Sequence, residues 1–125
     1  MQVIRNDITV AFDVDETLVM WVPHGKEPSE SAVPVDYYGS FQYVVPHKPH
    51  VQLLLANLKR GRNVIIWSQN GPQWASNVAK ALKLDLDGII VMAKPSMYVD
   101  DLPAQEWLGA KIYLKFDGKI TKDEK

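Results

Sequence analysis

An almost continuously apolar run, Ile8–Phe12, constrains the fold more than any other part of the sequence, and it ends directly in Asp13. Such a run is typical of a strand buried on both faces, as strands are in parallel sheets covered by helices. A second run, Asn63–Trp67, repeats the pattern and ends in Ser68. The sequence therefore predicts an α/β fold built on a parallel sheet.

Helical patterns separate the apolar runs. Apolar residues at helical spacing predict a helix over residues 49–60, with Pro49 in its first turn. A second helix is expected to begin at Pro72, with Asn70 as its cap. Further short strands and a closing turn are predicted at 89–92, 97–99, 111–116 and Asp117–Gly118. This alternation predicts a Rossmann-like, three-layer domain, in which ligands bind beyond the carboxyl ends of the strands.

Residues 19–46 interrupt the alternation. Prolines and glycines punctuate a segment rich in aromatic residues, which we interpret as a flap or hairpin inserted after the first strand. The segment is too short for a full cap domain, so an open, capless site is expected. Since the sequence has no linker or repeat, residues 1–125 are expected to form a single domain whose charged end, 119–125, is frayed.

Composition limits the classes of function. Fourteen basic and fifteen acidic residues leave a net charge of -1, so no overall positive field would recruit nucleic acid or an anionic membrane. The absence of cysteine removes disulfides and thiol nucleophiles and favours a reducing compartment such as the cytoplasm. No apolar stretch approaches the ~20 residues that span a bilayer, and no signal peptide is recognisable. A soluble, cytoplasmic protein is the expectation.

Polar side chains follow the predicted strands at the points where the strands end. They are Asp13 with Asp15, Ser68, Lys94, and Asp100 with Asp101. Because the carboxyl ends of parallel strands share one edge of a sheet, these side chains are expected to converge. Clustered carboxylates repel one another unless a divalent cation is present, and oxygen ligands suit Mg²⁺ better than zinc. The sequence therefore predicts a magnesium site at this edge.

The order and context of these residues resemble four motifs of a known superfamily. The segment Asp13–Thr17 follows a strand, and Ser68, Lys94 and Asp100–Asp101 come after it in that order. Over residues 8–101 the chain is similar to the haloacid dehalogenase (HAD) superfamily of phosphohydrolases, and it looks like the small, capless type. The resemblance implies a Mg²⁺-dependent phosphomonoester hydrolase that acts on a phosphorylated substrate.

The resemblance also implies a role for each residue of the motifs. Asp13 attacks phosphorus to form an aspartyl-phosphate, while Asp15 protonates the leaving alcohol and then activates the hydrolytic water. Ser68 and Lys94 bind the substrate phosphate, and Lys94 also cancels the anionic repulsion. Thr17 is grouped with these phosphate-binding residues and is expected to steady Asp15 or the turn after the strand.

The metal ligands that the resemblance implies are Asp13, Asp15, Asp100 and Asp101, with the main-chain carbonyl of Asp15 as a further ligand. Which of Asp100 and Asp101 binds the metal directly stays open. Only five residues separate Lys94 from Asp100, so the helix usual at this point has little room. Lys94 is therefore expected to lie on a loop.

Other conspicuous residues are expected to be structural. His24, His47 and His50 lack metal-ligand spacing on a clear helix and are predicted to lie at the surface. The aromatic residues of 19–46 are expected to pack onto the sheet rather than grip a substrate ring, and Trp21 is the one to test.

Functions other than hydrolysis remain open. The main alternative is a non-catalytic binding or regulatory module on the HAD fold, because a fold does not fix a function. A receiver domain would carry its phospho-accepting Asp after a later strand, a dehalogenase would not need Asp15, and a phosphomutase would need a site that excludes water. An open site admits a nucleotide, a nucleic-acid end, a sugar phosphate or a phosphoprotein, and a second copy of the chain could close it. The sequence does not assign the substrate.

Overall fold

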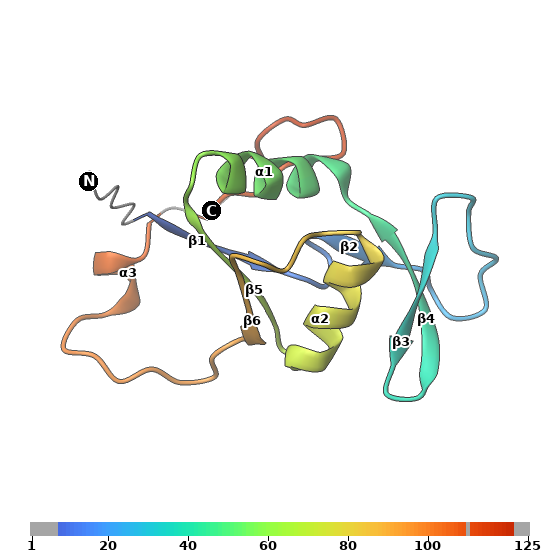
Figure 1. The fold of residues 1–125 in the computed structure, drawn as a ribbon, viewed down its shortest axis with the longest axis horizontal. Coiled ribbons are helices and arrows are strands. Elements are labelled where there is room, and N and C mark those ends of the chain that lie inside the picture. Colours follow the sequence, from blue (N-terminus) through green and yellow to red (C-terminus); the bar gives the residue numbers. More distant parts are fainter. Residues whose placement is uncertain (1–7, 110, 122–125) are drawn as a thin grey trace.

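The computed structural model describes residues 8–109 and 111–121, and this part of the chain forms two sheets and three helices (Figure 1). The strands are β1 (Thr9–Asp13), β2 (Val19–Trp21), β3 (Val33–Tyr37), β4 (Ser40–Pro46), β5 (Asn63–Ser68) and β6 (Ile89–Ala93). The helices are α1 (Lys48–Lys59), α2 (Pro72–Ala81) and α3 (Ala104–Trp107). The fold is mixed α/β, as the sequence predicts.

The parallel sheet has the strand order β1-β5-β6. Asp13 at the end of β1 is in register with Trp67, and Ser68 at the end of β5 is in register with Ala93. Lys94 extends the ladder by one step, because its main-chain N–H donates to the Ser68 carbonyl over 2.9 Å. The three predicted apolar strands are therefore confirmed, and their carboxyl ends lie side by side.

The two long helices follow the sequence prediction closely. Both have a proline in the first turn, where the missing N–H costs no intrahelical hydrogen bond. α2 lies between the sheets, because it contacts β3 of one sheet and β5 and β6 of the other (Figure 1). Trp74 and Val78 of α2 are buried in the same core as Leu54 of α1 and Ile66 of β5. This core holds α2 and the parallel sheet in fixed relative positions.

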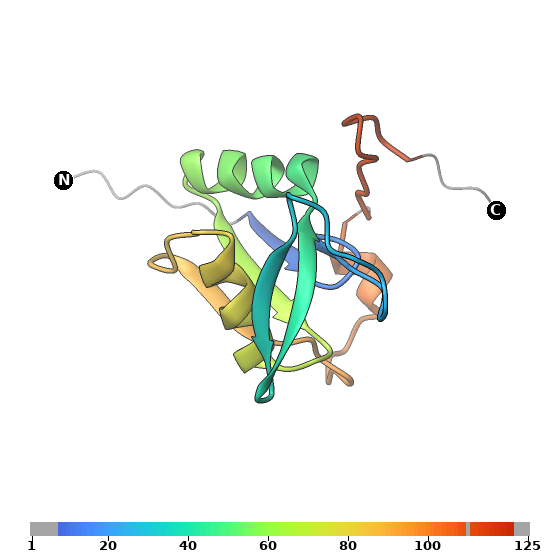
Figure 2. The ribbon, with the colours of Figure 1, turned by 90° about the vertical axis from the view of Figure 1, so that its right-hand side faces the viewer.

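Residues 19–46 form an antiparallel sheet in which β4 lies between β2 and β3. The β3–β4 hairpin turns at Tyr38 and Gly39, whose φ angles are 50° and 91°. Positive φ at both central residues gives a two-residue turn that matches the twist of the flanking strands, and glycine adopts it without strain. Figure 2 shows this hairpin facing the viewer, with α2 beside it.

The predicted strand at 97–99 does not form. These residues lie in an exposed segment that follows β6 and contains Pro95 and Pro103. A parallel strand needs a crossover of about a dozen residues or more to return to the sheet, and the connection after β6 is much shorter. The apolar side chains that suggested a strand are exposed instead, including Val99 at 95%.

The predicted strand at 111–116 is also wrong. Leu114 instead forms one antiparallel bridge with Ile120, around a turn in which the Gly118 N–H donates to the Lys115 carbonyl over 2.8 Å. The turn predicted at Asp117–Gly118 is thus confirmed. Of the end predicted to be frayed, residues 119–121 pair back onto this segment, and residues 122–125 lie outside the described residues.

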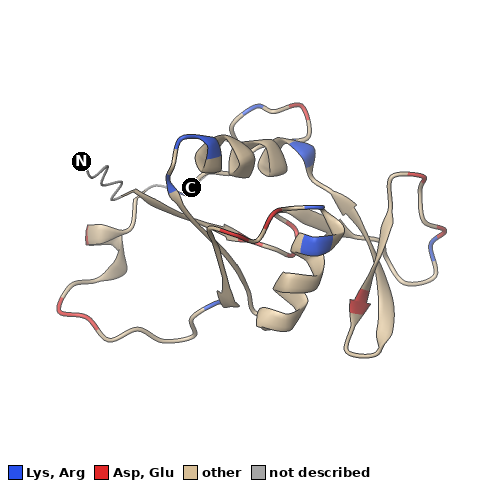
Figure 3. Cartoon of the chain, in the orientation of Figure 1, with Lys and Arg blue, Asp and Glu red and all other residues tan. Residues whose placement is uncertain are grey.

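Charged residues of both signs are spread over the ribbon, in keeping with the net charge of -1 (Figure 3). None of the helices in the described ranges has both the length and the apolar character needed to cross a membrane.

Candidate active site

Asp13 ends β1 with its two carboxylate oxygens in different environments. Thr17 donates its hydroxyl to Oδ2 over 3.3 Å, and Nζ of Lys94 lies 3.9 Å from Oδ1. The side chains of Lys94 and Asp13 keep 39% and 33% of their surface exposed. A carboxylate that is oriented by one hydroxyl, partly exposed and next to a cation is suited to nucleophilic attack on an anionic group. The Thr17 hydroxyl thus contacts Asp13, whereas the sequence led us to expect that Thr17 steadies Asp15 or the turn after the strand.

Asp15 is surrounded by hydrogen-bond donors. The indole N–H groups of Trp21 and Trp74 donate to Oδ1 over 2.6 and 2.8 Å. The Ser68 hydroxyl and the Asn70 side-chain amide each donate to Oδ2 over 3.1 Å. A carboxylate has about four acceptor positions, so these donors satisfy it fully. Asp15 therefore joins β2, the end of β5 and α2 at one point.

Ser68 is completely buried, with 0% of its surface exposed. Its hydroxyl donates to Asp15 and accepts the main-chain N–H of Asn70 over 3.0 Å. As placed, Ser68 orients Asp15 rather than facing a ligand. Its predicted contact with a substrate phosphate stays a prediction, and that contact requires the hydrogen bond to Asp15 to be given up.

The prediction that Asn70 caps α2 is wrong. Gly71 occupies the cap position with a φ of 96°, and no side chain caps the helix. Asn70 instead donates to Asp15 and accepts the Tyr37 hydroxyl over 3.4 Å, while its main-chain carbonyl accepts the Tyr38 hydroxyl. Asn70 thus attaches the β3–β4 hairpin to the group of donors around Asp15.

Three aromatic rings pack edge to face beside Asp15. The ring centroids of Trp21 lie 5.3 Å from Tyr37 and 5.5 Å from Trp74, and Tyr37 lies 5.1 Å from Trp74. The predicted packing role is confirmed for Trp21 and Tyr37, whereas Phe41 is 73% exposed. Sequence reasoning missed the contacts with Asp15. The available signal was that a buried indole N–H needs an acceptor.

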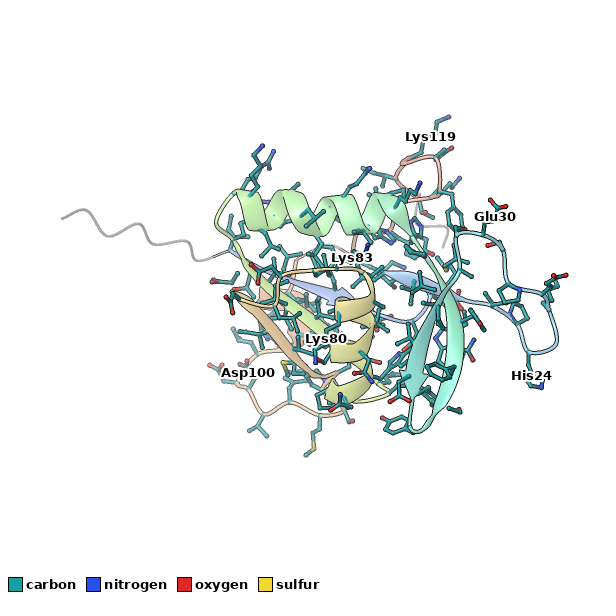
Figure 4. All side chains as sticks on the ribbon, turned by 45° about the vertical axis from the view of Figure 1, so that its right-hand side comes forward. His24, Glu30, Lys80, Lys83, Asp100 and Lys119 are labelled. Atoms are coloured by element: carbon teal, nitrogen blue, oxygen red, sulfur yellow. The ribbon has the colours of Figure 1, made fainter. Side chains whose placement is uncertain are left out.

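Asp100 and Asp101 are not brought to the other carboxylates. Both are exposed on the segment after β6, and Figure 4 places Asp100 at the edge of the molecule; among the described residues no three acidic or histidine side chains gather as a metal site requires. The Leu102 N–H, donating over 3.1 Å, and the neighbouring Asp101 hold the pKa of Asp100 below its usual value. The predicted convergence of four carboxylates is therefore not seen.

The described side chains, as arranged, do not fit a Mg²⁺ site. In residues 8–109 and 111–121, no three His, Asp or Glu side chains gather closely enough to hold a metal. The oxygens of Asp15 already meet four donors, whereas Asp13 is 33% exposed and has Lys94 beside one oxygen. The metal-binding roles of Asp13, Asp15, Asp100 and Asp101 stay predictions.

Two of the three histidines predicted at the surface are buried. His47 and His50 are 1% and 2% exposed, whereas His24 is exposed. The His47 ring stacks between His50 and Phe116, with centroid distances of 4.2 and 4.5 Å, and neither ring nitrogen has a partner among the described atoms. Burial lowers the pKa of His47 from 6.5, and the adjacent His50 lowers it further. The prediction failed because the segment around Phe116 covers these rings.

Comparison with known proteins gives one match. The family model described as NLI interacting factor-like phosphatase matches residues 8–105, a range that includes all the predicted site residues. Neither a curated protein nor a solved structure gives a significant match. The matched range ends before residues 111–121, which pack against His47 and His50.

Proposed function

This chain belongs to the NLI interacting factor-like phosphatase family, a family of HAD-superfamily phosphatases, and on that premise we propose that it hydrolyses a phosphomonoester with Asp13 as its nucleophile. The family supports a phosphatase rather than the non-catalytic module that the sequence left as an alternative. The observation that carries the assignment of Asp13 is its position at the end of β1, partly exposed and 3.9 Å from Lys94.

The proposed reaction has two steps. An oxygen of Asp13 attacks phosphorus, and the bond from phosphorus to the leaving oxygen breaks while Asp15 gives that oxygen a proton. Water then attacks the aspartyl-phosphate and passes a proton to Asp15. The bond between phosphorus and Asp13 breaks, so that phosphate leaves and both aspartates return to their starting states.

Lys94 supports this reaction through its charge. A carboxylate and a phosphate repel each other, and a cation between them lowers the energy of the approach. The ammonium of Lys94 lies beside one oxygen of Asp13, while Thr17 holds the other. Lys94 can therefore contact the phosphoryl oxygens without displacing the bond that orients the nucleophile.

The acid–base role of Asp15 requires a change of hydrogen-bond partners. A proton on Asp15 must displace one of the donors around it. Trp74 and Ser68 are fully buried, whereas Trp21 and Asn70 are half-buried and connect to the antiparallel sheet. We infer that Trp21 or Asn70 gives way when substrate binds, and that the antiparallel sheet then acts as the flap expected from the sequence.

The proposal includes a requirement for Mg²⁺, which is typical of HAD-like phosphatases. The described side chains do not assemble a metal site, so the requirement rests on the family alone. The substrate is proposed to be a phosphorylated molecule that reaches an open site: a nucleotide, a nucleic-acid end, a sugar phosphate or a phosphoprotein. A screen of these classes by kcat/KM distinguishes them, because that ratio measures discrimination between substrates.

The mechanism is tested by changing Asp13→Asn and assaying hydrolysis of an aryl phosphate with Mg²⁺ present. Loss of the nucleophile is expected to reduce turnover by about 10³-fold or more. Asp85→Asn is a matched control, because Asp85 is an exposed loop residue that accepts a main-chain N–H, as asparagine also can. When the wild-type protein is quenched with acid during turnover, mass spectrometry should detect the aspartyl-phosphate intermediate on Asp13. Undiminished turnover in Asp13→Asn would show that the mechanism is wrong.

A further inference from the structure

The turn that follows Asp15 is held from outside at three successive positions. The main-chain carbonyl oxygens of residues 16, 17 and 18 each accept a hydrogen bond from beyond the turn. The partners are, in order, the Tyr113 hydroxyl at 3.0 Å, Nδ1 of His50 at 2.7 Å and the main-chain N–H of His47 at 2.8 Å. Each of these bonds acts on the backbone between Asp15 and β2.

The first residue of this turn has an unfavourable backbone conformation. Glu16 has a φ of 62°, in the left-handed region that residues with a Cβ rarely adopt. A conformation of this kind persists only where the surrounding structure fixes it. The Tyr113 hydroxyl on the Glu16 carbonyl is one contact that fixes it.

His50 links the turn to the C-terminal part of the chain. Its Nδ1 faces the Thr17 carbonyl, which can only accept, so this nitrogen carries the proton. Its Nε2 lies 2.7 Å from the main-chain N–H of Leu114, which can only donate. Nε2 therefore carries no proton and accepts this hydrogen bond. One neutral tautomer therefore satisfies both partners. Since the ring is 2% exposed, water cannot readily replace either bond.

The link continues to the nucleophile. Thr17, whose carbonyl accepts from His50, donates its own hydroxyl to Oδ2 of Asp13 over 3.3 Å. A displacement of His50 would therefore move the residue that orients Asp13. Neither His50 nor Tyr113 contacts the Asp13 or Asp15 carboxylate in the described hydrogen bonds.

The segment that supplies Tyr113 and Leu114 is a small hairpin, residues 113–121, closed by the Leu114–Ile120 bridge. We call it the C-terminal hairpin. The Tyr113 ring packs edge-on against His50 with a centroid distance of 4.8 Å, and Phe116 stacks on His47. Figure 2 shows this segment next to the end of α1 at which the helix begins. It lies beyond residues 8–105, the range that the family model matches.

We propose that His50 and Tyr113 are positioning residues of the phosphatase site, and that the C-terminal hairpin completes the site by fixing the turn that carries Asp15 and Thr17. The proposal rests on the proposed role of Asp13. Because both residues act through backbone carbonyls, their loss affects the geometry of attack and hence kcat. Misplacing a catalytic group by about 1 Å can cost about 10²-fold in rate.

A matched pair of substitutions tests His50. In His50→Asn the side-chain amide keeps a donor near the position of Nδ1, whereas in His50→Gln it keeps an acceptor near that of Nε2. If the bond to Thr17 positions the nucleophile, His50→Asn keeps kcat within about threefold and His50→Gln loses about tenfold or more, with KM changed little in both. Equal kcat values in the two variants overturn the proposal. So do losses of kcat that merely parallel a fall in melting temperature.

Tyr113→Phe tests the second bond, because it removes the hydroxyl and keeps the ring against His50. We expect kcat to fall about fivefold or more at nearly constant melting temperature. Tyr43→Phe is the control, since Tyr43 is a 41% exposed tyrosine of β4 and is not part of the C-terminal hairpin. An unchanged kcat in Tyr113→Phe contradicts the positioning role.

A measurement independent of activity separates this inference from the proposed function. Two-bond ¹H–¹⁵N NMR correlations of the wild-type protein near neutral pH should show His50 as the tautomer with its proton on Nδ1. A proton on Nε2 overturns the inference whatever the activity. Conversely, full turnover in Asp13→Asn together with an Nδ1–H tautomer would refute the proposed nucleophile and leave the linkage from His50 to the turn intact.

Discussion

Trp21 donates its indole N–H to Asp15 over 2.6 Å, although the two residues belong to different parts of the fold. Trp21 ends β2 of the antiparallel sheet, and Asp15 follows β1 of the parallel sheet. Residues 19–46 are therefore coupled to the second aspartate of the motif, and not merely inserted beside it. A displacement of this sheet would therefore alter the hydrogen bonding of Asp15.

Trp21→Phe removes that donor and keeps most of the ring packing with Tyr37 and Trp74. Hydrogen bonds to charged groups contribute about 1.5–3 kcal/mol, and partial exposure of this site reduces the value, so we expect the free energy of unfolding to fall by about 1–2 kcal/mol. Urea denaturation measures it. Trp107→Phe is the control, because Trp107 is 52% exposed on α3. Equal stability of the Trp21 and Trp107 variants would show that the bond to Asp15 contributes nothing.

Lys94→Ala should weaken catalysis by removing the cation beside Asp13. Electrostatic stabilisation by one such group is commonly worth about 10²-fold in rate, so we expect kcat/KM to fall by about that factor. The fold should be unaffected, because Lys94 contributes to the sheet through its main-chain N–H. Lys80→Ala, at the exposed end of α2, controls for the loss of one positive charge (Figure 4). A kcat/KM value equal to that of the control would remove Lys94 from the site.

Stability should decrease in mild acid because of His47. Burial holds the pKa of folded His47 below 6.5, so as the pH falls below that value the unfolded chain takes up a proton that the folded protein does not. The contribution is fully present above pH 6.5 and is lost as the pH falls toward the folded pKa. Urea unfolding at about pH 7.5 and about pH 5 measures the difference.

His47→Phe is the informative variant for that pH dependence. Phenylalanine can stack between His50 and Phe116 as the imidazole does, and the His47 ring nitrogens have no hydrogen-bond partner to lose in the described structure. We expect stability near neutral pH to be retained within about 1 kcal/mol and the acid loss to become smaller. A pH dependence identical to that of the wild-type protein would assign the acid loss to other groups.

Removal of divalent metal should abolish phosphatase activity, and Mg²⁺ should restore it. Asp100→Asn and Asp101→Asn, made separately, test which residue contributes to the metal requirement. If the substituted aspartate binds the metal, its loss is expected to raise the Mg²⁺ concentration needed for half-maximal activity by about 10-fold or more, as substitutions around a metal commonly do. Full activity in excess chelator would refute the Mg²⁺ requirement, and wild-type Mg²⁺ dependence in both variants would confine the metal to other residues.

Local patterns were sufficient for much of the fold. The apolar runs predicted β1, β5 and β6, and helical spacing with a proline in the first turn predicted α1 and α2. The same patterns failed at 97–99, where the connection after β6 is too short for a crossover, and at 111–116, where Leu114 pairs with Ile120 instead of the parallel sheet. A short apolar run can join a parallel sheet only when the chain before it is long enough for a crossover.

The sequence also predicted that Asp13 and Lys94 meet at one edge of the parallel sheet, and they do: Asp13 ends β1 and Lys94 follows β6, with β5 between these strands. It gave the wrong role for Asn70, which looks like a helix cap in the sequence and lies against Asp15 in the structure. A helix cap is a local interaction, whereas the contact with Asp15 depends on where the turn after β5 sits relative to β1.

By itself, the sequence determined the parallel strands, the helices between them and the order of polar residues at the strand ends, because these follow from periodicities of a few residues. Tertiary structure alone decided what surrounds Asp15, and that His50 is buried beneath Tyr113 rather than exposed. Apart from the bond from Trp21, which is six positions from Asp15, these contacts join residues more than 50 positions apart, and their geometry depends on how whole elements pack. No local pattern encodes that packing, so the donors around Asp15 and the support of the turn emerged only from the fold.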